Sequence, residues 1–508
     1  MSIASAWSIA LVGMEGTLVE VEAAISPGLP RTVLVGLPDA ALHESRDRCR
    51  AALTAAGVGW PSELLTINLT PASLPKAGTH YDLAIAAAVL AASGIVPRHV
   101  ARGAVLMGEL GLDGRVRRVR GVLPGLLAAR HRGKKSAVVP WEQVGEARLV
   151  EGMAVRGVAN LDDLIEVLQG REVVHNELPA APPEPTAGAA APPDLADLTG
   201  QPEARWAAEV AAAGGHHMFL HGPPGVGKTM LAMRLPGLLP DLTTPEALEV
   251  SALHSLAGGN LKDGLIRRPP FAAPHHNATV AAMVGGGSRL ARPGAISLAH
   301  RGVLFLDEAP EFAPQVMEAL RTPMEAGFVA VARSEGVVRY PSQFQLVLAA
   351  NPCPCGFMGL GSGCRCAPMA IRRYNTRLSG PILDRVDIHT HMAMVPSVLA
   401  RADTAIEPTA VVAARVAEAR ARSQARLRGT GWCRNAEVPG HVARAGVPEA
   451  ALTLVEKQVL KGQMSARGVD KVARLAWTLA DLAGRDRICL DDVAAAMTLN
   501  HGDWTVAA

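Results

Sequence analysis

The chain has 508 residues, of which 49% are hydrophobic, enough to build substantial cores. Lys and Arg number 50 against 47 Asp and Glu, a net charge of +3. A charge this small does not indicate a protein that binds nucleic acid through a basic surface overall. Any nucleic acid must therefore meet a local basic patch. Aromatic residues make up only 3% of the chain, which argues against a large base-stacking platform.

Length, cysteine usage and apolar patterning predict a cytoplasmic protein of about three domains. The seven cysteines are an odd number, which points to a reducing compartment rather than a disulfide scaffold. Residues 1–10 lack the basic segment of a signal peptide, and the apolar run over 83–96 is too short to span a bilayer. We expect no membrane association.

Residues 1–172 are predicted to form a mixed α+β domain. Strands are expected at 18–23, 32–36, 64–69, 104–107 and 136–139, and helices at 40–56 and 82–93. The basic segment 115–120 (R-V-R-R-V-R) permits two interpretations, a contact with a phosphate backbone or a solvated strand face. The next residues, 173–193, are rich in Pro and Ala, which predicts an extended, exposed linker.

A phosphate-binding loop is the most specific motif of the chain. Residues 222–229 read G-x-x-x-x-G-K-T, between an apolar strand at 218–220 and a helix at 230–234. Glycines let the backbone N–H groups turn toward phosphate oxygens. Lys228 would bind the β/γ-phosphates of ATP, and the Thr229 hydroxyl would bind Mg²⁺. The predicted nucleotide-binding residues are Gly222, Pro223, Pro224, Gly225, Val226, Gly227, Lys228 and Thr229.

A second ATPase motif follows about 80 residues later. The apolar run 303–306 predicts a buried parallel strand, and Asp307 and Glu308 come directly after it. Ligands of α/β sheets bind at the carboxyl ends of the strands. Asp307 would therefore orient Mg²⁺, and Glu308 would polarise the water that attacks the γ-phosphate.

Between and beyond these motifs lie three further features. His275 and His276 resemble metal ligands, but no partner of suitable spacing follows, so a structural or DNA-facing loop is preferred. Residues 328–340 predict a β-hairpin with its turn at 334–336. The strand at 344–350 then ends at the polar residue Asn351.

Four closely spaced cysteines suggest a structural Zn²⁺ site. Cys353, Cys355, Cys364 and Cys366 read C-x-C…C-x-C, and four thiolates suit a tetrahedral ion. The spacing is tighter than the usual C-x₂-C. Ordinary reduced thiols or a redox-sensitive pair are the alternatives.

Residues 401–508 are predicted to be helical. The helix at 411–428 carries arginines at 415, 420, 422, 426 and 428, which either contact DNA or lie on a solvated face with a Glu418–Arg422 pair. Ser465 is a candidate N-cap for the helix that runs to 483.

The central part of the chain resembles AAA+ ATPases of the magnesium-chelatase/MCM branch. The resemblance rests on three segments: D-L-x-x-L-x-G-Q at 194–201, the insert at 274–294 and the hairpin before Asn351. The resemblance implies a core over 194–400 and a lid over 401–508. It also implies that Asn351 is the sensor 1 residue, and that Arg467, in S-x-R, is the sensor 2 arginine. The segment 377–387 resembles the one that supplies an arginine finger to the neighbouring subunit, with Arg385 as the first choice and Arg377 as the second.

The N-terminal domain resembles the Lon-protease-like domain of RadA-type proteins. The resemblance rests on 67–83, 114–116 and 126–129. The catalytic serine position falls at His80 and the lysine position at Leu123 or Gly125, so the Ser–Lys dyad is missing. We expect an inactive peptidase scaffold. Ser73 and Thr79 are the remaining candidate nucleophiles.

The whole order of domains resembles the ComM/YifB family of magnesium-chelatase-like ATPases. The implied fold is an α/β AAA+ P-loop core with an α-helical lid, plus an N-terminal α+β Lon-protease-like (ribosomal S5 domain 2-like) domain. The implied function is a hexameric DNA helicase that drives branch migration of single-stranded or branched DNA in recombination or natural transformation, using ATP and Mg²⁺. A chelatase-type remodelling ATPase acting on a protein partner is the alternative, although the chain lacks the D-x-S-x-S motif of the chelatase partner. An ATP-dependent protease is disfavoured by the missing dyad.

Overall fold

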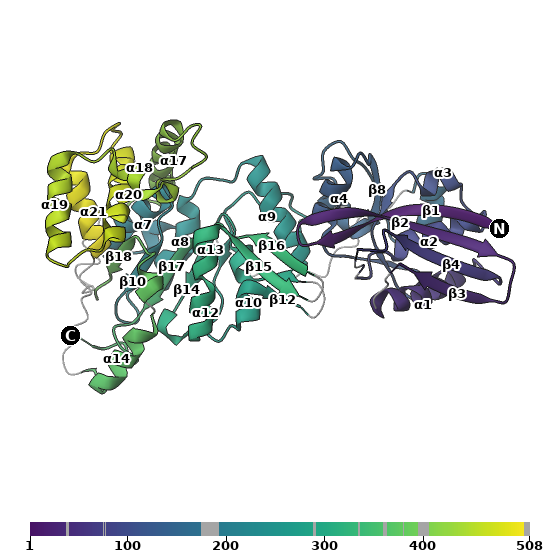
Figure 1. Cartoon of the computed structure of the whole chain (residues 1–508), viewed down its shortest axis with the longest axis horizontal. Coiled ribbons are helices and arrows are strands. Elements are labelled where there is room, and N and C mark those ends of the chain that lie inside the picture. The colour runs from purple at the N-terminus through teal and green to yellow at the C-terminus, as the bar shows by residue number, and fades with distance from the viewer. Residues whose placement is uncertain are drawn as a thin grey trace.

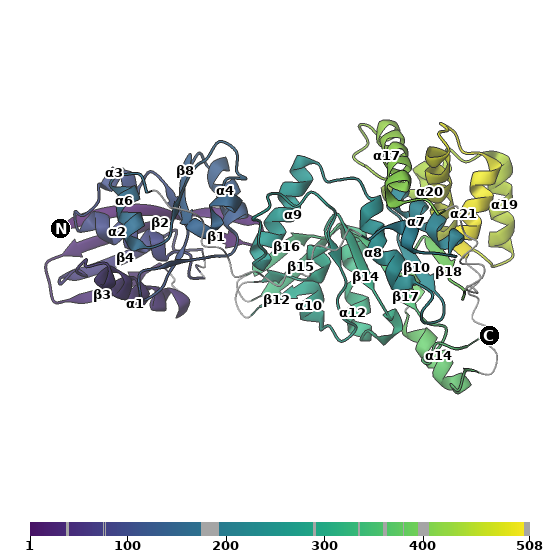
Figure 2. The ribbon, with the colours of Figure 1, turned by 180° about the vertical axis from the view of Figure 1, so that it is seen from behind.

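The computed structural model describes residues 1–36, 40–74, 76, 78–173, 193–287, 291–333, 336–358, 363–378, 380–394 and 406–501. Three parts follow one another along an elongated molecule: an N-terminal α/β part, a central parallel sheet with its helices, and a helical C-terminal part (Figure 1). The view from behind shows the same order (Figure 2). The predicted linker over 173–193 lies almost entirely outside the described residues.

A mixed seven-stranded sheet, in the order β3-β4-β2-β1-β5-β8-β9, forms the N-terminal part. Its strands are β1 (Ser2–Val12), β2 (Glu15–Ser26), β3 (Arg31–Val35), β4 (Leu64–Thr70), β5 (Val105–Leu106), β8 (Ser136–Pro140) and β9 (Ala154–Val158). The helices are α1 (Ala40–Ala55), α2 (Asp82–Ala92), α3 (Arg98–Ala101), α4 (Val122–His131), α5 (Val144–Ala147) and α6 (Leu161–Leu168). The five strands and two helices predicted here are confirmed, with ends shifted by a few residues.

Sequence patterns do not reveal the long strand β1. Its residues include Ala4, Ala6 and Ser8, small side chains with little intrinsic preference for strands. The strand forms because it pairs along its whole length with β2, through a turn at Gly13, whose φ is 63°. Tertiary pairing therefore overrides local propensity.

The central sheet has five strands in the order β11-β14-β17-β10-β18, and every neighbouring pair is parallel. They are β11 (Phe271–Ala272), β14 (Val303–Leu306), β17 (Gln345–Ala350), β10 (Met218–His221) and β18 (Ile388–His391). Strands buried on both faces need apolar runs rather than alternation, which is why β10, β14 and β17 were predictable. The accompanying helices are α7 (Pro202–Gly214), α8 (Lys228–Leu238), α9 (Thr244–Ala257), α10 (Val280–Val284), α11 (Ala295–Leu298), α12 (Pro314–Ala319), α13 (Arg321–Ala326), α14 (Pro368–Arg377) and α15 (Gly380–Leu383).

Three small ribbons complete these two parts. They are β6–β7 (Glu109–Leu110, Val116–Arg117), β12–β13 (Gly285–Gly286, Arg292–Pro293) and β15–β16 (Phe328–Arg333, Gly336–Pro341). The β15–β16 ribbon is antiparallel and confirms the predicted hairpin, although residues 334 and 335 of its turn lie outside the described part of the chain.

The C-terminal part is helical, as predicted. Its helices are α17 (Thr409–Arg426), α18 (Gly440–Arg444), α19 (Glu449–Leu460), α20 (Ala466–Leu482) and α21 (Leu490–His501). The predicted N-cap is confirmed, because the Ser465 hydroxyl accepts the Gly468 amide. No helix within the described residues is long and apolar enough to cross a membrane.

Arginines of α17 tie this helical part to the core, a role the sequence did not suggest. Arg415 pairs with Glu209 of α7 at 2.7 Å, and Arg420 donates to the carbonyl of Ala212 at 2.9 Å. The expected Glu418–Arg422 pair is present at 3.5 Å. Arg415 and Arg420 are thus held in contacts between the two parts.

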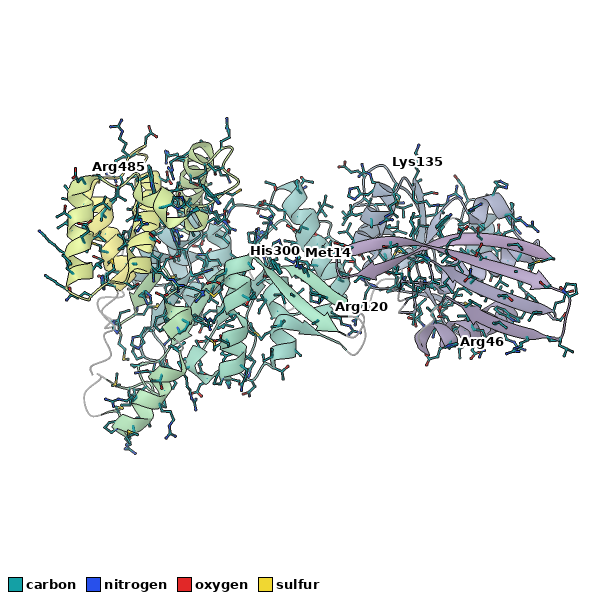
Figure 3. The ribbon with its side chains drawn as sticks, viewed as in Figure 1. Met14, Arg46, Arg120, Lys135, His300 and Arg485 are labelled. Atoms are coloured by element: carbon teal, nitrogen blue, oxygen red, sulfur yellow. The ribbon has the colours of Figure 1, made fainter. Side chains whose placement is uncertain are left out.

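The N-terminal part docks on α9 of the central part through a shared apolar cluster. Val122 and Leu123 of α4 belong to the same buried cluster as Ala252 of α9. Within it, Glu146 accepts the amide of Leu123 at 3.1 Å and the hydroxyl of Ser255. A buried carboxylate with such partners fixes the junction in one geometry. Met14, labelled in Figure 3, packs beside this contact against the cluster that contains the hairpin.

Candidate nucleotide site

The P-loop connects the carboxyl end of β10 to the first residue of α8. Gly225 and Gly227 have φ values of 79° and 95°, a region that only glycine enters without strain. Gly222 is required for a different reason. A Cβ at this position would lie 2.1 Å from the carbonyl oxygen of Met392. The glycines of the motif thus serve both loop curvature and close packing.

Lys228 is folded into the phosphate cradle. Its Nζ donates to the carbonyls of Gly222 (2.6 Å) and Pro223 (2.8 Å) and to Asn351 Oδ1 (3.0 Å). Burial lowers the pKa of Lys228 to about 8, against the opposing effect of Asp307 and Glu308. The predicted sensor residue and the P-loop lysine are thereby brought into direct contact.

Thr229 and Asp307 meet, as the predicted Mg²⁺ site requires. The Thr229 hydroxyl donates to Asp307 Oδ2 at 2.6 Å. Thr229 lies in the first turn of α8, and Asp307 directly follows β14, so the fold brings together a hydroxyl and a carboxylate oxygen from two separate segments. Mg²⁺ favours oxygen ligands of these kinds, so the residues fit the ion.

Glu308 adopts a left-handed backbone with φ 51°, which is uncommon outside glycine. Strain of this kind gathers at functional sites. Its Oε2 lies 3.5 Å from His276 Nδ1. No sequence pattern links His276 to Glu308, because only the fold brings the loop after β11 beside the end of β14. His276 is therefore a site residue that sequence reasoning missed.

The four cysteines converge immediately after Asn351. The Sγ–Sγ distances are 3.4 Å for Cys353–Cys355 and 3.7 Å for both Cys353–Cys364 and Cys355–Cys364, and all four sulfurs, Cys366 included, lie within 4.8 Å of one another. A Zn–S bond of about 2.3 Å gives a tetrahedral edge of about 3.8 Å. The thiolate set therefore fits a structural metal ion.

Arg385 and Arg467 lie at the opposite edge of the sheet from the P-loop. Both line a cavity of about 1000 Å³ with His217, Gly302 and Gln345, which stand at the amino ends of β10, β14 and β17. The P-loop, Asp307 and Asn351 follow the carboxyl ends of the same strands. Within one chain, the two arginines and the P-loop are therefore separated by the length of the sheet.

Each of these arginines is paired within its own chain. Arg385 contacts Glu325 and donates to the carbonyl of Pro381 at 2.6 Å. Arg467 pairs with Asp384. The alternative finger, Arg377, pairs with Glu311 at 2.9 Å, near the end of β14 and so at the P-loop edge.

Three arginines gather where the N-terminal part meets the core: Arg118, Arg120 and Arg292. We call them the junction arginines. Arg118 donates to Asn260 Oδ1 at 3.4 Å, and Arg120 lies over Gly258, whose added Cβ would meet its Nε at 3.2 Å. Burial and the nearby Arg292 of β13 lower the pKa of Arg120. Across the described ranges, none of the three arginines forms an ion pair with a carboxylate. Figure 3 labels Arg120 at this junction.

The catalytic dyad of Lon-type peptidases is not assembled at the positions predicted for it. His80 contacts the carbonyl of Ile9 at 2.8 Å, and Leu123 is buried. The Thr79 hydroxyl donates to Glu109 rather than to an amine. A buried lysine, Lys76, donates to the carbonyl of Gly36 at 3.0 Å.

A parallel sheet whose strand ends carry a P-loop, an acidic pair and a polar sensor residue defines an AAA+ ATPase, here with a helical lid. Comparison with known protein families agrees. The chain matches the models described as magnesium chelatase, subunit ChlI, over residues 194–399; subunit ChlI of Mg-chelatase over 21–143; and magnesium chelatase, subunit ChlI C-terminal, over 406–500.

Three relatives place the chain more closely. It is 52% identical to the uncharacterized protein Rv2897c of Mycobacterium tuberculosis over 505 residues, 99% of each chain. It is 37% identical to competence protein ComM of Haemophilus influenzae over 503 residues, 98% of this chain and 97% of that one. A partial match, 30% identity over 175 residues, links 33% of this chain to 36% of the DNA repair protein RadA of Halalkalibacterium halodurans. The chain belongs to the ComM/YifB family of magnesium-chelatase-like AAA+ ATPases.

Proposed function

We propose that this chain is one subunit of an ATP-driven ring, by family analogy a hexamer, that acts on DNA as a branch-migration helicase or translocase in recombination or natural transformation. The observation that carries the proposal is the division of the ATPase machinery between the two edges of one sheet. A chain with its P-loop at one edge and its arginines at the other needs a second copy to complete a site.

The residues at the P-loop edge are proposed to act as follows. Lys228 exchanges its carbonyl partners for the β/γ-phosphates, and Asn351 holds the lysine and the attacking water in place. Thr229 and Asp307 would hold Mg²⁺, which neutralises phosphate charge when bound. Glu308 accepts a proton from the attacking water.

Arg385 and Arg467 are proposed to act on the neighbouring subunit. Stabilising the charge of the transferred phosphoryl group is the role of such arginines. Their own chain's P-loop lies at the far edge of the sheet, so each would have to leave Glu325 or Asp384 and reach across a subunit interface. This assignment makes turnover depend on assembly.

The junction arginines support a DNA partner. A cation without a carboxylate partner is available to a phosphate backbone, whereas the arginines of α17 are already engaged. Two relatives support the same direction, since one is named for competence and the other for DNA repair. We assign the N-terminal domain to this contact. The missing dyad supports a scaffold without peptidase activity.

Zn²⁺ is proposed as the ion of the cysteine cluster, because four thiolates in a tetrahedron select zinc or iron–sulfur centres. Metal analysis of the purified protein tests this assignment. Substoichiometric zinc after reduction would contradict it.

ATP hydrolysis measured across a panel of DNA structures, including a four-way junction, tests the proposed function. We expect single-stranded or branched DNA to stimulate hydrolysis. Hydrolysis that no DNA stimulates would overturn the DNA role and favour the alternative, a remodelling ATPase acting on a protein, which the magnesium-chelatase family models also support.

Charge reversal tests the junction arginines. Arg118→Glu with Arg120→Glu should weaken DNA binding by about tenfold or more and lower the slope of log affinity against log salt by about two. The matched control is Arg132→Glu with Lys135→Glu, two exposed basic residues that follow α4. Figure 3 labels Lys135, which lies away from Arg120 and the junction. Fluorescence anisotropy with labelled DNA provides the measurement. Equal losses of DNA affinity in both double variants would show that the junction arginines are not the DNA contact.

A further inference from the structure

The four-cysteine segment is built into the nucleotide site rather than attached beside it. β17 ends at Ala350, and Asn351 directly follows it. Asn351 Oδ1 accepts a hydrogen bond from Lys228, and Cys353 is only two residues further along the chain and fully buried. A metal ion bound by Cys353 would therefore restrain the backbone that carries Asn351.

The same segment also packs directly against the P-loop. Gly356 lies against Pro224, and a Cβ added to Gly356 would meet Pro224 Cδ at 2.5 Å. The φ of Gly356 is 83°, so the backbone turns there in a way that suits glycine. The turn is closed by a hydrogen bond from the Gly356 amide to the Cys353 carbonyl at 2.9 Å. Asn351 and Gly356 thus contact the P-loop at Lys228 and at Pro224, respectively.

Ordinary packing does not account for the shape of this segment. Of the described residues between Cys353 and Cys366, the large apolar side chains Phe357 and Met358 are 45% and 39% exposed. Cys355, Cys364 and Cys366 are only partly buried. Because little apolar surface is removed from water, the hydrophobic effect supplies little stabilisation, and the convergence of the sulfurs requires another source.

The end of the segment returns to the same edge of the sheet. Tyr374 of α14 is buried beside the backbone of Asn351. Arg377 pairs with Glu311, three residues after Glu308. Residues 351–358 therefore lead away from the ATP site to the cysteine cluster, and α14, which follows the cluster, returns to the site.

We propose that a metal ion bound by Cys353, Cys355, Cys364 and Cys366 positions Asn351 and Pro224, so that metal occupancy and nucleotide binding are thermodynamically coupled. This inference rests on the proposed ATPase function. Such coupling is reciprocal: if the metal strengthens nucleotide binding, bound nucleotide must retain the metal by the same factor.

The first test uses the unmodified full-length protein. Zn²⁺ release to a chromogenic chelator is followed with and without ADP or a non-hydrolysed ATP analogue, and nucleotide affinity is measured before and after zinc removal. We expect about one Zn²⁺ per chain, equilibrium zinc affinity raised about fivefold or more by nucleotide, and the same factor lost in nucleotide affinity without zinc. Zinc and nucleotide affinities that are independent of each other would overturn the coupling.

The second test separates coupling from metal binding. Gly356→Ala keeps all four thiols but forces a Cβ against Pro224, whereas Gly363→Ala places its Cβ 3.4 Å from Phe357 Cβ, an ordinary contact. We expect both variants to retain Zn²⁺, and only Gly356→Ala to lose hydrolysis, by about tenfold. Wild-type turnover in zinc-retaining Gly356→Ala would contradict the positioning role. If the wild type hydrolyses no ATP at all, the proposed function fails instead, and the zinc–nucleotide linkage still decides the inference.

Discussion

The two edges of the central sheet differ in what their polar groups do. At the carboxyl edge, Lys228, Thr229, Asp307 and Asn351 bond to one another or to the loop they share. At the amino edge, Arg385 and Arg467 pair with carboxylates that belong to no catalytic motif. One edge carries the phosphate-binding motifs, and the other holds two arginines that are paired with carboxylates.

Under the proposed function, this difference means that each chain carries two halves of a composite site, which are matched only between neighbouring subunits. In that proposal, the pairs with Glu325 and Asp384 neutralise the two arginines until a neighbour's phosphate replaces each carboxylate. A partly exposed ion pair contributes little to stability, so exchange between the two partners costs little. This arrangement suits a site that assembles and disassembles during a cycle.

Removing the amino-edge arginine should have the largest effect on turnover. Arg385→Ala is expected to lower the rate by about 10³–10⁵ with nucleotide affinity nearly intact, because the guanidinium acts on the transition state. Arg377→Ala, at the P-loop edge, is the matched control and should be far milder. Steady-state ATPase assays and fluorescent-nucleotide titrations provide the measurements.

Mixing two kinds of defective subunit tests whether Arg385 acts on the nucleotide that is bound by the neighbouring subunit. Rings mixed from Arg385→Ala and Lys228→Ala chains should recover part of the activity, because some interfaces then combine an intact P-loop with an intact arginine. Absence of recovery at every mixing ratio would remove support for a composite site.

Replacing Glu308, the proposed base at the carboxyl edge, should cause the second-largest loss of ATP hydrolysis. Glu308→Gln keeps the shape of the side chain but removes the proton acceptor, so hydrolysis should fall by about 10²–10⁴ while ATP binding and ring formation persist. Sedimentation with bound ATP, together with phosphate release, measures both properties. Turnover close to wild type would show that Glu308 is not the base.

The smallest effect concerns stability at the amino edge. His217 Nδ1 accepts the amide of Leu346 at 3.0 Å, and burial lowers the pKa of His217 to about 4 from its ordinary 6.5. Because the folded pKa is depressed, this contribution is full above pH 6.5 and is lost as the pH falls toward 4. The free energy of unfolding should decline by at most about 1.4 kcal/mol per pH unit from this group.

Urea unfolding between pH 7.5 and 4.5 measures that decline. His217→Asn retains an acceptor oxygen but cannot titrate, so the variant should show a shallower dependence on pH than the wild type. Identical slopes would mean that other groups, rather than His217, set the acid sensitivity.

Much of the nucleotide edge was predictable because its chemistry is local. A P-loop is contiguous, and buried parallel strands such as β14 leave apolar runs that end at the functional carboxylates. β1 was missed because small residues carry no strand signal without β2 beside them. The contact of His276 with Glu308 was missed because the two residues come from different strand ends.

The sequence by itself determined which chemical groups are present: the P-loop, the acidic pair, the asparagine after β17 and the four thiols, each defined by residue type and short spacing. Only the tertiary structure decided their relations. Parallel strands place every P-loop-edge residue together and put Arg385 and Arg467 a sheet's length away, while the docking of α4 on α9 brings Arg120 to Arg292. The physical reason is that short-range patterns encode local backbone geometry, whereas distances between segments depend on how the buried faces pack.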